Sequence, residues 1–87
     1  MNYLHYDLNL QEGDLVEVTL NKQANVRLLN GTNYLQYRRG AQHRYYGGLA
    51  TKSPVQLRAP HSGYWHLVVD LGSTAGRVKA SVRTIKG

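Results

Sequence analysis

Hydrophobic and polar residues alternate along most of this chain, which is the pattern of strands that bury one face. In the first segment Leu4, Tyr6, Leu8 and Leu10 share one side, opposite a mostly polar set. The same period of two recurs in residues 15–20, 24–29, 55–59, 65–71 and 77–84. No window of helical length carries a clean apolar stripe, so the pattern favours strands throughout.

About seven short strands separated by turn signals are typical of a sandwich or a barrel. We predict an all-β fold: a compact two-sheet, jelly-roll-like sandwich of about seven short, mostly antiparallel strands. A single domain spans residues 1–87. The strongest inward face begins at Trp65, which we expect at the centre of the core. The strand at residues 55–59 is bracketed by Pro54 and Pro60, which predicts a short strand at a sheet edge.

Residues 32–42 interrupt the alternation. Asn30-Gly31 is a turn signal, and Thr32 could cap one short helical turn that ends at Gly40. Tyr34 and Tyr37 would then lie on one side of that turn. The next segment, residues 43–52, reads as a strand whose Gly47-Gly48 pair indicates a bulge or a close approach of two backbones.

The composition adds two constraints. The chain contains no cysteine, which excludes disulfides and thiolate chemistry, and it has seven tyrosines and one tryptophan but no phenylalanine. A buried tyrosine hydroxyl needs a partner, so we expect several of these hydroxyls at the surface. No stretch is apolar enough to span a bilayer, and the first seven residues do not resemble a signal peptide. We therefore expect a cytoplasmic protein with no membrane partner.

The net charge of +6 is unevenly distributed. Residues 1–17 hold four of the five acidic residues, while residues 18–87 hold all eleven lysines and arginines and one acid, Asp70. Such a basic region favours anionic partners, although a solvated basic surface that only maintains solubility remains an equal alternative.

The candidate binding residues fall into two groups. The first interleaves aromatic and basic side chains in an irregular stretch: Tyr34, Tyr37, Arg38, Arg39, Arg44, Tyr45 and Tyr46. Tyrosine and arginine supply contact area and hydrogen bonds at low entropic cost. We therefore take this stretch as the best candidate for a binding site in the chain. The alternative is a loop whose tyrosines pack down while its arginines reach outward.

The second group is a basic strand face. Arg77, Lys79 and Arg83 occupy alternate positions of the last predicted strand, and Arg27 and Arg58 also point outward on theirs. If these strands are neighbours, they form a face that attracts phosphates. The alternative is a charged face that prevents edge-to-edge pairing.

Catalytic and metal-binding motifs are weak. No pair of carboxylates has an evident shared site, no nucleophile elbow or phosphate loop is present, and we predict that the protein is not an enzyme and has no cofactor. His61 and His66 lie five residues apart, with His5 as a third candidate ligand, a spacing that predicts no tight metal site.

Several strings nevertheless resemble a known family. They are Gly13-Asp14, the segment 24–29, Tyr45-Tyr46-Gly47-Gly48, Ser53-Pro54 and the stretch from Trp65-His66 to Val69-Asp70-Leu71-Gly72. Together they resemble a family of small bacterial domains known as a domain of unknown function, number eighteen-eighty-three. The resemblance covers nearly the whole chain. It implies a compact β-sandwich, either free-standing or joined to another domain such as a TIR domain, and it implies no catalytic residues.

Two functions from different classes follow. The protein is either a module that binds an anionic or aromatic ligand, such as a glycan, a nucleotide or a nucleic acid, or a module for protein–protein interaction or self-assembly. In the second case the exposed apolar residues Leu15, Leu29 and Val68 would form the interface, and a homo-oligomer is one form it would take.

Overall fold

The computed structural model describes residues 2–87, which form seven strands and one helix. The strands are β1 (Tyr3–Leu10), β2 (Leu15–Leu20), β3 (Ala24–Leu29), β4 (Tyr46–Ala50), β5 (Val55–Arg58), β6 (Gly63–Asp70) and β7 (Ala80–Ile85). The helix α1 (Gly31–Arg38) lies between β3 and β4. All strand pairs are antiparallel.

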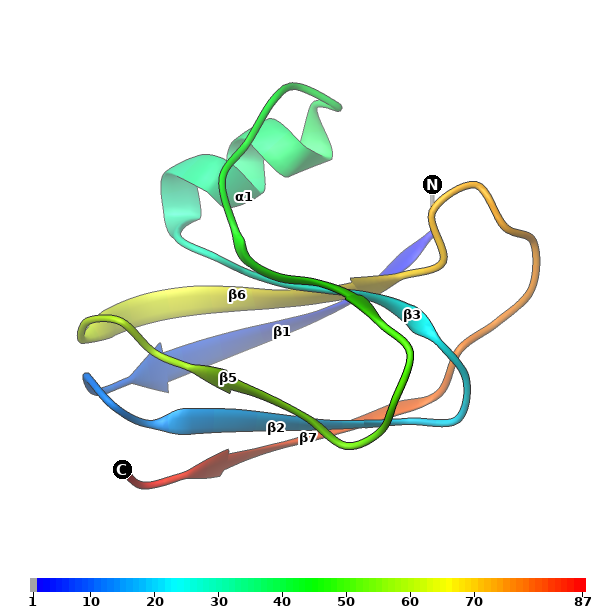
Figure 1. Cartoon of the computed structure of the whole chain (residues 1–87). Helices are drawn as coiled ribbons and strands as arrows, with labels where there is room; N and C mark the ends of the chain where they lie inside the picture. The colour runs from blue at the N-terminus through cyan, green and yellow to red at the C-terminus, as the bar shows by residue number, and fades with distance from the viewer. Residues whose placement is uncertain (1) are drawn as a thin grey trace.

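The strands form two sheets that face each other (Figure 1). One sheet has the order β1-β6-β3-β4 and the other the order β5-β2-β7. The chain crosses between the sheets after β1, β2, β4, β5 and β6, while α1 covers the outer face of the four-stranded sheet (Figure 1). The predicted all-β, two-sheet sandwich is therefore confirmed.

The core lies between the sheets and consists of the inward positions that the alternation predicts. Val16, Val18, Val26 and Leu67 are fully buried there, and Trp65 is 2% exposed. The Trp65 indole Nε1 donates a hydrogen bond to the His61 carbonyl at 3.1 Å, which satisfies the polar end of the ring. The predicted burial of Trp65 in the core is confirmed.

The helix begins two residues earlier than the sequence suggests. Asn30 is the N-cap, and its Oδ1 accepts a hydrogen bond from the Asn33 amide at 2.9 Å, so the predicted cap at Thr32 and the predicted turn at Asn30-Gly31 are wrong. An asparagine followed by glycine suits both a turn and a helix start, because its side chain competes for nearby amides in either case. Gly40, with a φ of 73°, follows the helix as expected.

The strand expected at residues 43–52 is shorter, since β4 begins at Tyr46. The Arg44 amide donates to Asn33 Oδ1 at 2.8 Å, so the preceding segment is tied to α1 instead of to a neighbouring strand. Within β4, the Gly47 backbone lies so close to the Val26 carbonyl that a Cβ would collide with it. This confirms the predicted close approach of two backbones.

A second buried cluster forms where α1 packs on the outer face of the four-stranded sheet. Tyr34 and Tyr37 lie on one side of the helix, as predicted, and pack against Leu29 and Val68. Leu29 and Val68 are fully buried, so the expectation that they are exposed interface residues is wrong. Alternation places them outward from the sandwich correctly, but the helix covers that face.

Candidate functional site

A buried carboxylate holds α1 to the sheet. Asp70, at the end of β6, is 1% exposed, and its Oδ2 accepts hydrogen bonds from the Tyr37 hydroxyl at 2.7 Å and from Arg27 Nη1 at 2.6 Å. Its Oδ1 accepts from Asn25 Nδ2 at 3.0 Å and from the Gly72 amide at 2.8 Å. Four donors thus satisfy a charge that would be costly to bury alone.

These contacts set the ionisation of both partners. Burial alone would raise the pKa of Asp70, but the hydrogen bonds from Asn25, Tyr37 and Gly72 and the charge of Arg27 outweigh it and lower that pKa. Burial and the hydrogen bond to Asp70 raise the pKa of Tyr37. At neutral pH the carboxyl is therefore ionised, and the phenol is a neutral donor.

The two helix tyrosines of the predicted binding stretch are packed in this layer. Tyr34 is 8% exposed and Tyr37 is 5% exposed. The Tyr34 hydroxyl lies 3.1 Å from the Tyr3 hydroxyl and 3.1 Å from His5 Nδ1. Burial, followed by the hydrogen bond with Tyr3, raises the pKa of Tyr34 to about 12. The hydroxyls of these two tyrosines are thus committed to contacts inside the protein, as in the alternative in which the tyrosines of this stretch pack down.

The later part of the predicted stretch lines a groove of about 610 Å³. The groove lies beside the start of α1, between the segment that precedes β4 and the turn that precedes β6. Its lining residues are Leu28, Asn30, Asn33, His43, Arg44, Tyr45, Tyr46, His61 and Trp65. The structure thus brings Arg44, Tyr45 and Tyr46 of the predicted set together and adds His43, His61 and Trp65, which were not among the predicted ligand-binding residues.

The aromatic side chains that form the walls of the groove pack against Trp65 and Arg27. Tyr46 is 50% exposed and lies edge-on to Trp65, with 5.9 Å between ring centroids. The His61 ring lies 4.7 Å from the same indole. The Tyr45 ring, 42% exposed, lies 5.1 Å from the Arg27 guanidinium. The rings therefore present exposed surface from fixed positions.

The polar groups of the groove include basic side chains and asparagines, and none of its lining residues, all within residues 2–87, is acidic. The bond between the Arg44 amide and Asn33 fixes the backbone at Arg44. His43 Nδ1 lies 2.9 Å from the Ala41 carbonyl, while its buried Nε2 has no hydrogen-bond partner within the described residues. The groove is thus suited to an acceptor-rich ligand.

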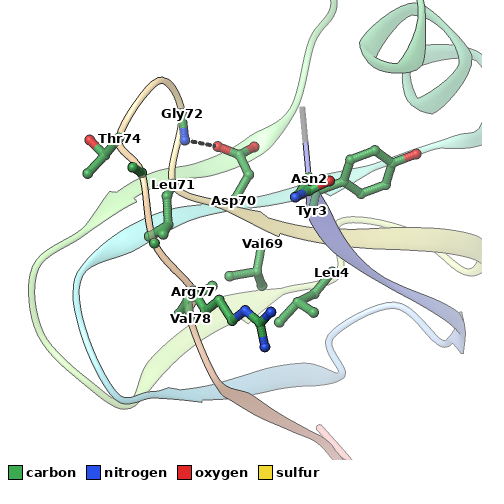
Figure 2. Close-up of a pocket in the computed structure, with 12 residues that line it drawn as sticks. Asn2, Tyr3, Leu4, Val69, Asp70, Leu71, Gly72, Thr74, Arg77 and Val78 are labelled. Carbon is green, nitrogen blue, oxygen red and sulfur yellow. Dashed lines mark hydrogen bonds between the residues drawn. The ribbon is translucent and has the colours of Figure 1, made fainter.

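The remaining predicted site residues lie elsewhere. Arg38 and Arg39 are exposed at the end of α1 and are not part of the groove lining. Arg77 lines a different cavity, of about 390 Å³, at the end of the sandwich where β1 begins. In Figure 2 the Asp70 carboxylate beside this cavity is bonded to the Gly72 amide, and the Arg77 guanidinium lies apart from both.

The basic strand face that the sequence predicts is not found in the structure. Arg77 and Lys79 precede β7, which begins at Ala80, so they do not occupy strand positions. Arg83 is on β7 but is paired with Glu17 at 2.6 Å. Arg27 belongs to the other sheet and is paired with Asp70. Pairing of this kind depends on which strands become neighbours, which alternation alone does not determine.

A cluster of two histidines and one carboxylate lies on the outer face of the four-stranded sheet. His5 and Asp7 lie on β1, and His66 lies on β6 directly opposite Asp7. His5 Nε2 is 2.8 Å from His66 Nδ1, and Asp7 Oδ1 is 3.3 Å from the first and 3.1 Å from the second. Burial lowers the pKa of His66, and the neighbouring His5 acts in the same direction.

Sequence analysis identified two members of this cluster and missed the third. It considered His5 and His66 together with His61, but His61 packs on Trp65 instead. The missing signal was the pairing of β1 with β6, because the alternation already places His5 and Asp7 on one face of β1.

Comparisons with known proteins identify a family only. A family model described as "Domain of unknown function (DUF1883)" matches residues 1–87. No curated protein and no solved structure matches the chain. Within residues 2–87, the single helix of eight residues is too short to cross a membrane.

Proposed function

The chain belongs to the DUF1883 family, a domain of unknown function, and on this premise we propose that it is a non-catalytic module that binds an anionic ligand whose rings can stack on tyrosine. The ligand class is that of nucleotides, single-stranded nucleic acids and acidic glycans. One observation carries the proposal: a groove with exposed aromatic walls contains Arg44 and no acidic side chain among its lining residues, all of which lie in the described part of the chain.

Each part of the groove supports this ligand class. The exposed Tyr46 ring offers a face or edge for stacking, which is sequence-tolerant and contributes about 1–3 kcal/mol per nucleic-acid base. Arg44 offers a forked set of donors that suits a phosphate or a carboxylate. Asn30 and Asn33 line the helix end of the groove and supply further polar groups there.

The charge distribution supports the same conclusion. Arg38 and Arg39 are exposed near the end of α1 and add positive potential at longer range. By contrast Arg27 and Arg83 are each paired with a carboxylate, so they contribute less to that potential. The proposal also places the protein in the cytoplasm, where nucleotides and nucleic acids are present. The absence of cysteine is consistent with that reducing compartment.

Self-assembly is the alternative that the same experiment must distinguish. Two of the three residues expected to form an apolar interface, Leu29 and Val68, are buried under α1. The remaining exposed apolar side chains, such as Leu49 and Tyr64, lie on different strands, β4 and β6.

The test is a titration followed by two-dimensional NMR of the backbone amides. The probes are adenosine monophosphate, a single-stranded oligonucleotide and an acidic oligosaccharide. We expect at least one probe to shift the amides of Arg44, Tyr46 and His61, and the double variant Arg44→Ala/Tyr46→Ala to lose this binding. The matched control Arg38→Ala/Arg39→Ala, which also removes exposed arginines, should retain it within a few-fold.

Three outcomes would overturn the proposal. No probe shifts the groove amides, the control variant loses binding as fully as the groove variant, or the shifts follow protein concentration instead of probe concentration. The last outcome would identify self-association, which size-exclusion chromatography at low and high salt would then confirm.

A further inference from the structure

We propose that His5, Asp7 and His66 form a binding site for a divalent transition-metal ion of the Zn²⁺ class, on the face of the sheet next to α1. This goes beyond the proposed ligand groove and uses none of its residues. It also departs from the expectation drawn from the histidine spacing, because that spacing took no account of strand pairing.

The first argument is the convergence of the three donor atoms. His5 Nε2, His66 Nδ1 and Asp7 Oδ1 lie between 2.8 and 3.3 Å from one another. At an ion placed about 2.1 Å from all three, the donor atoms would subtend angles of roughly 85–105°, which are close to the octahedral value and below the tetrahedral one. Two imidazoles and one carboxylate on one side of an ion are a ligand set that suits Zn²⁺, Ni²⁺, Cu²⁺ or Fe²⁺.

The second argument is the rigidity of the scaffold. The ligands lie on β1 and β6, two neighbouring strands paired over eight residues, and Asp7 is the direct cross-strand partner of His66. His5 is two residues before Asp7, so the pleat places both side chains on the same face. Backbone pairing therefore sets the spacing of the site without an ion.

The third argument is a buried side chain that orients both rings. Tyr34 stacks on the His66 ring with centroids 4.3 Å apart and planes at 7°, and on the His5 ring at 4.3 Å and 21°. Its hydroxyl lies 3.1 Å from His5 Nδ1, the nitrogen that faces away from the cluster, and Tyr3 lies within hydrogen-bond distance of the same hydroxyl. Outer contacts of this kind fix the orientation of ligating histidines in metal sites.

The site is open on its solvent side. The Asp7 side chain is 76% exposed, whereas those of His5 and His66 are 26% and 21% exposed. Three protein donors leave at least one coordination position, which water or an exogenous group would fill. The alternative is a surface hydrogen-bond chain through Tyr34, His5, His66 and Asp7 that holds no ion.

The experiment uses the full chain without an affinity tag, freed of metal with a chelator. Zn²⁺ and Co²⁺ are titrated by calorimetry, and the Co²⁺ absorption spectrum reports ligand number and geometry. We expect one equivalent to bind, and His5→Gln, His66→Gln and Asp7→Asn each to weaken binding at least tenfold. Glu12→Gln is the matched control, since it removes an exposed carboxylate outside both the cluster and the groove, and it should bind Co²⁺ as the wild type does.

Tyr34→Phe tests the positioning role separately. It keeps the stacked ring and removes the hydroxyl that contacts His5, so we expect affinity to fall by about 10- to 100-fold while one equivalent still binds. Apo melting temperatures are recorded for all variants. Because the Asp7 side chain is exposed and glutamine keeps a polar side chain at His5 and His66, we expect the three ligand variants to remain folded.

The proposal is overturned if neither ion binds more tightly than millimolar, or if Glu12→Gln weakens binding as much as the ligand variants. It is also overturned if binding survives in His5→Gln and His66→Gln. These outcomes are independent of the groove, so the nucleotide and glycan titrations can succeed or fail without affecting them.

Discussion

The phenolic hydroxyl of Tyr37 donates a 2.7 Å hydrogen bond to Oδ2 of Asp70, and this bond joins the helix to the central strand of the larger sheet. Both side chains are almost fully buried. The contact explains why a tyrosine stands at this position where a phenylalanine would pack equally well, because only tyrosine brings a donor to the carboxylate. The Tyr-rich stretch is therefore partly structural, and recognition in our proposal passes to Arg44 and Tyr46.

Replacing Tyr37 with phenylalanine should lower the free energy of unfolding by about 1.5–3 kcal/mol, the usual range for a hydrogen bond to a charged group. The ring still fills its position, so the loss isolates the bond. The measurement is urea denaturation followed by circular dichroism. Tyr64→Phe is the matched control, since Tyr64 is 77% exposed, and it should change stability by less than about 0.5 kcal/mol. Equal stability of Tyr37→Phe and the wild type would contradict the assignment.

Because the ionised Asp70 carboxylate stabilises the fold, we expect the stability of the protein to decrease in acid. The folded pKa of Asp70 lies below its unfolded value, which is about 3.9, so ionised Asp70 contributes stability above that value. This contribution is lost as the pH falls through the folded pKa. Denaturation of wild type and Asp70→Asn should therefore show a large stability difference at pH 7 that narrows below about pH 4.

Direct titration provides the second measurement, which does not depend on the variant folding. The ¹³C resonance of the Asp70 carboxyl should titrate below about pH 3.9 in the wild type. Titration at or above that value would show that burial outweighs the four hydrogen-bond donors, contrary to our account.

The fold was largely predictable because the alternation that defines each strand can be seen within a few neighbouring residues. Alternation placed Leu4, Val16 and Trp65 in the core correctly, since the pleat alone decides which side chains share a face. Pairing between distant strands was not predictable in the same way. It brings His66 opposite Asp7 and Arg27 beside Asp70, and both of these depend on contacts across tens of residues. The candidate sites lie where such pairings meet, so sequence analysis found part of each site but not the complete set of residues.

A glycine pair in β4 offers a test of backbone packing. A Cβ at Gly47 would meet the Val26 carbonyl at a distance that real side chains do not adopt, whereas one at Gly48 meets nothing nearby. Both residues have a positive φ, so alanine should cost about 1–3 kcal/mol of strain at either position. Gly47→Ala should cost clearly more than Gly48→Ala, measured by thermal and urea denaturation. Equal losses would show that the edge strand moves away freely.

The final prediction separates specific recognition from general attraction by its salt dependence. Arg77 and Lys79 lie outside the groove and before β7, so they can attract an anion only at a distance. Arg77→Ala/Lys79→Ala should therefore weaken binding of an oligonucleotide by a few-fold and flatten the dependence of affinity on salt concentration.

The groove variant should behave differently. Arg44→Ala alone removes a direct charged contact worth about 1.5–3 kcal/mol, or roughly 10- to 150-fold in affinity. Tyr46→Ala should weaken binding at every salt concentration with little change in slope, because stacking does not depend on counterion release. Affinities measured by fluorescence anisotropy between about 50 and 200 mM salt distinguish variants that weaken direct contacts from variants that weaken only long-range attraction. If Arg77→Ala/Lys79→Ala abolishes binding while Arg44→Ala and Tyr46→Ala do not, the recognition site lies at the cavity beside Arg77 and not in the groove.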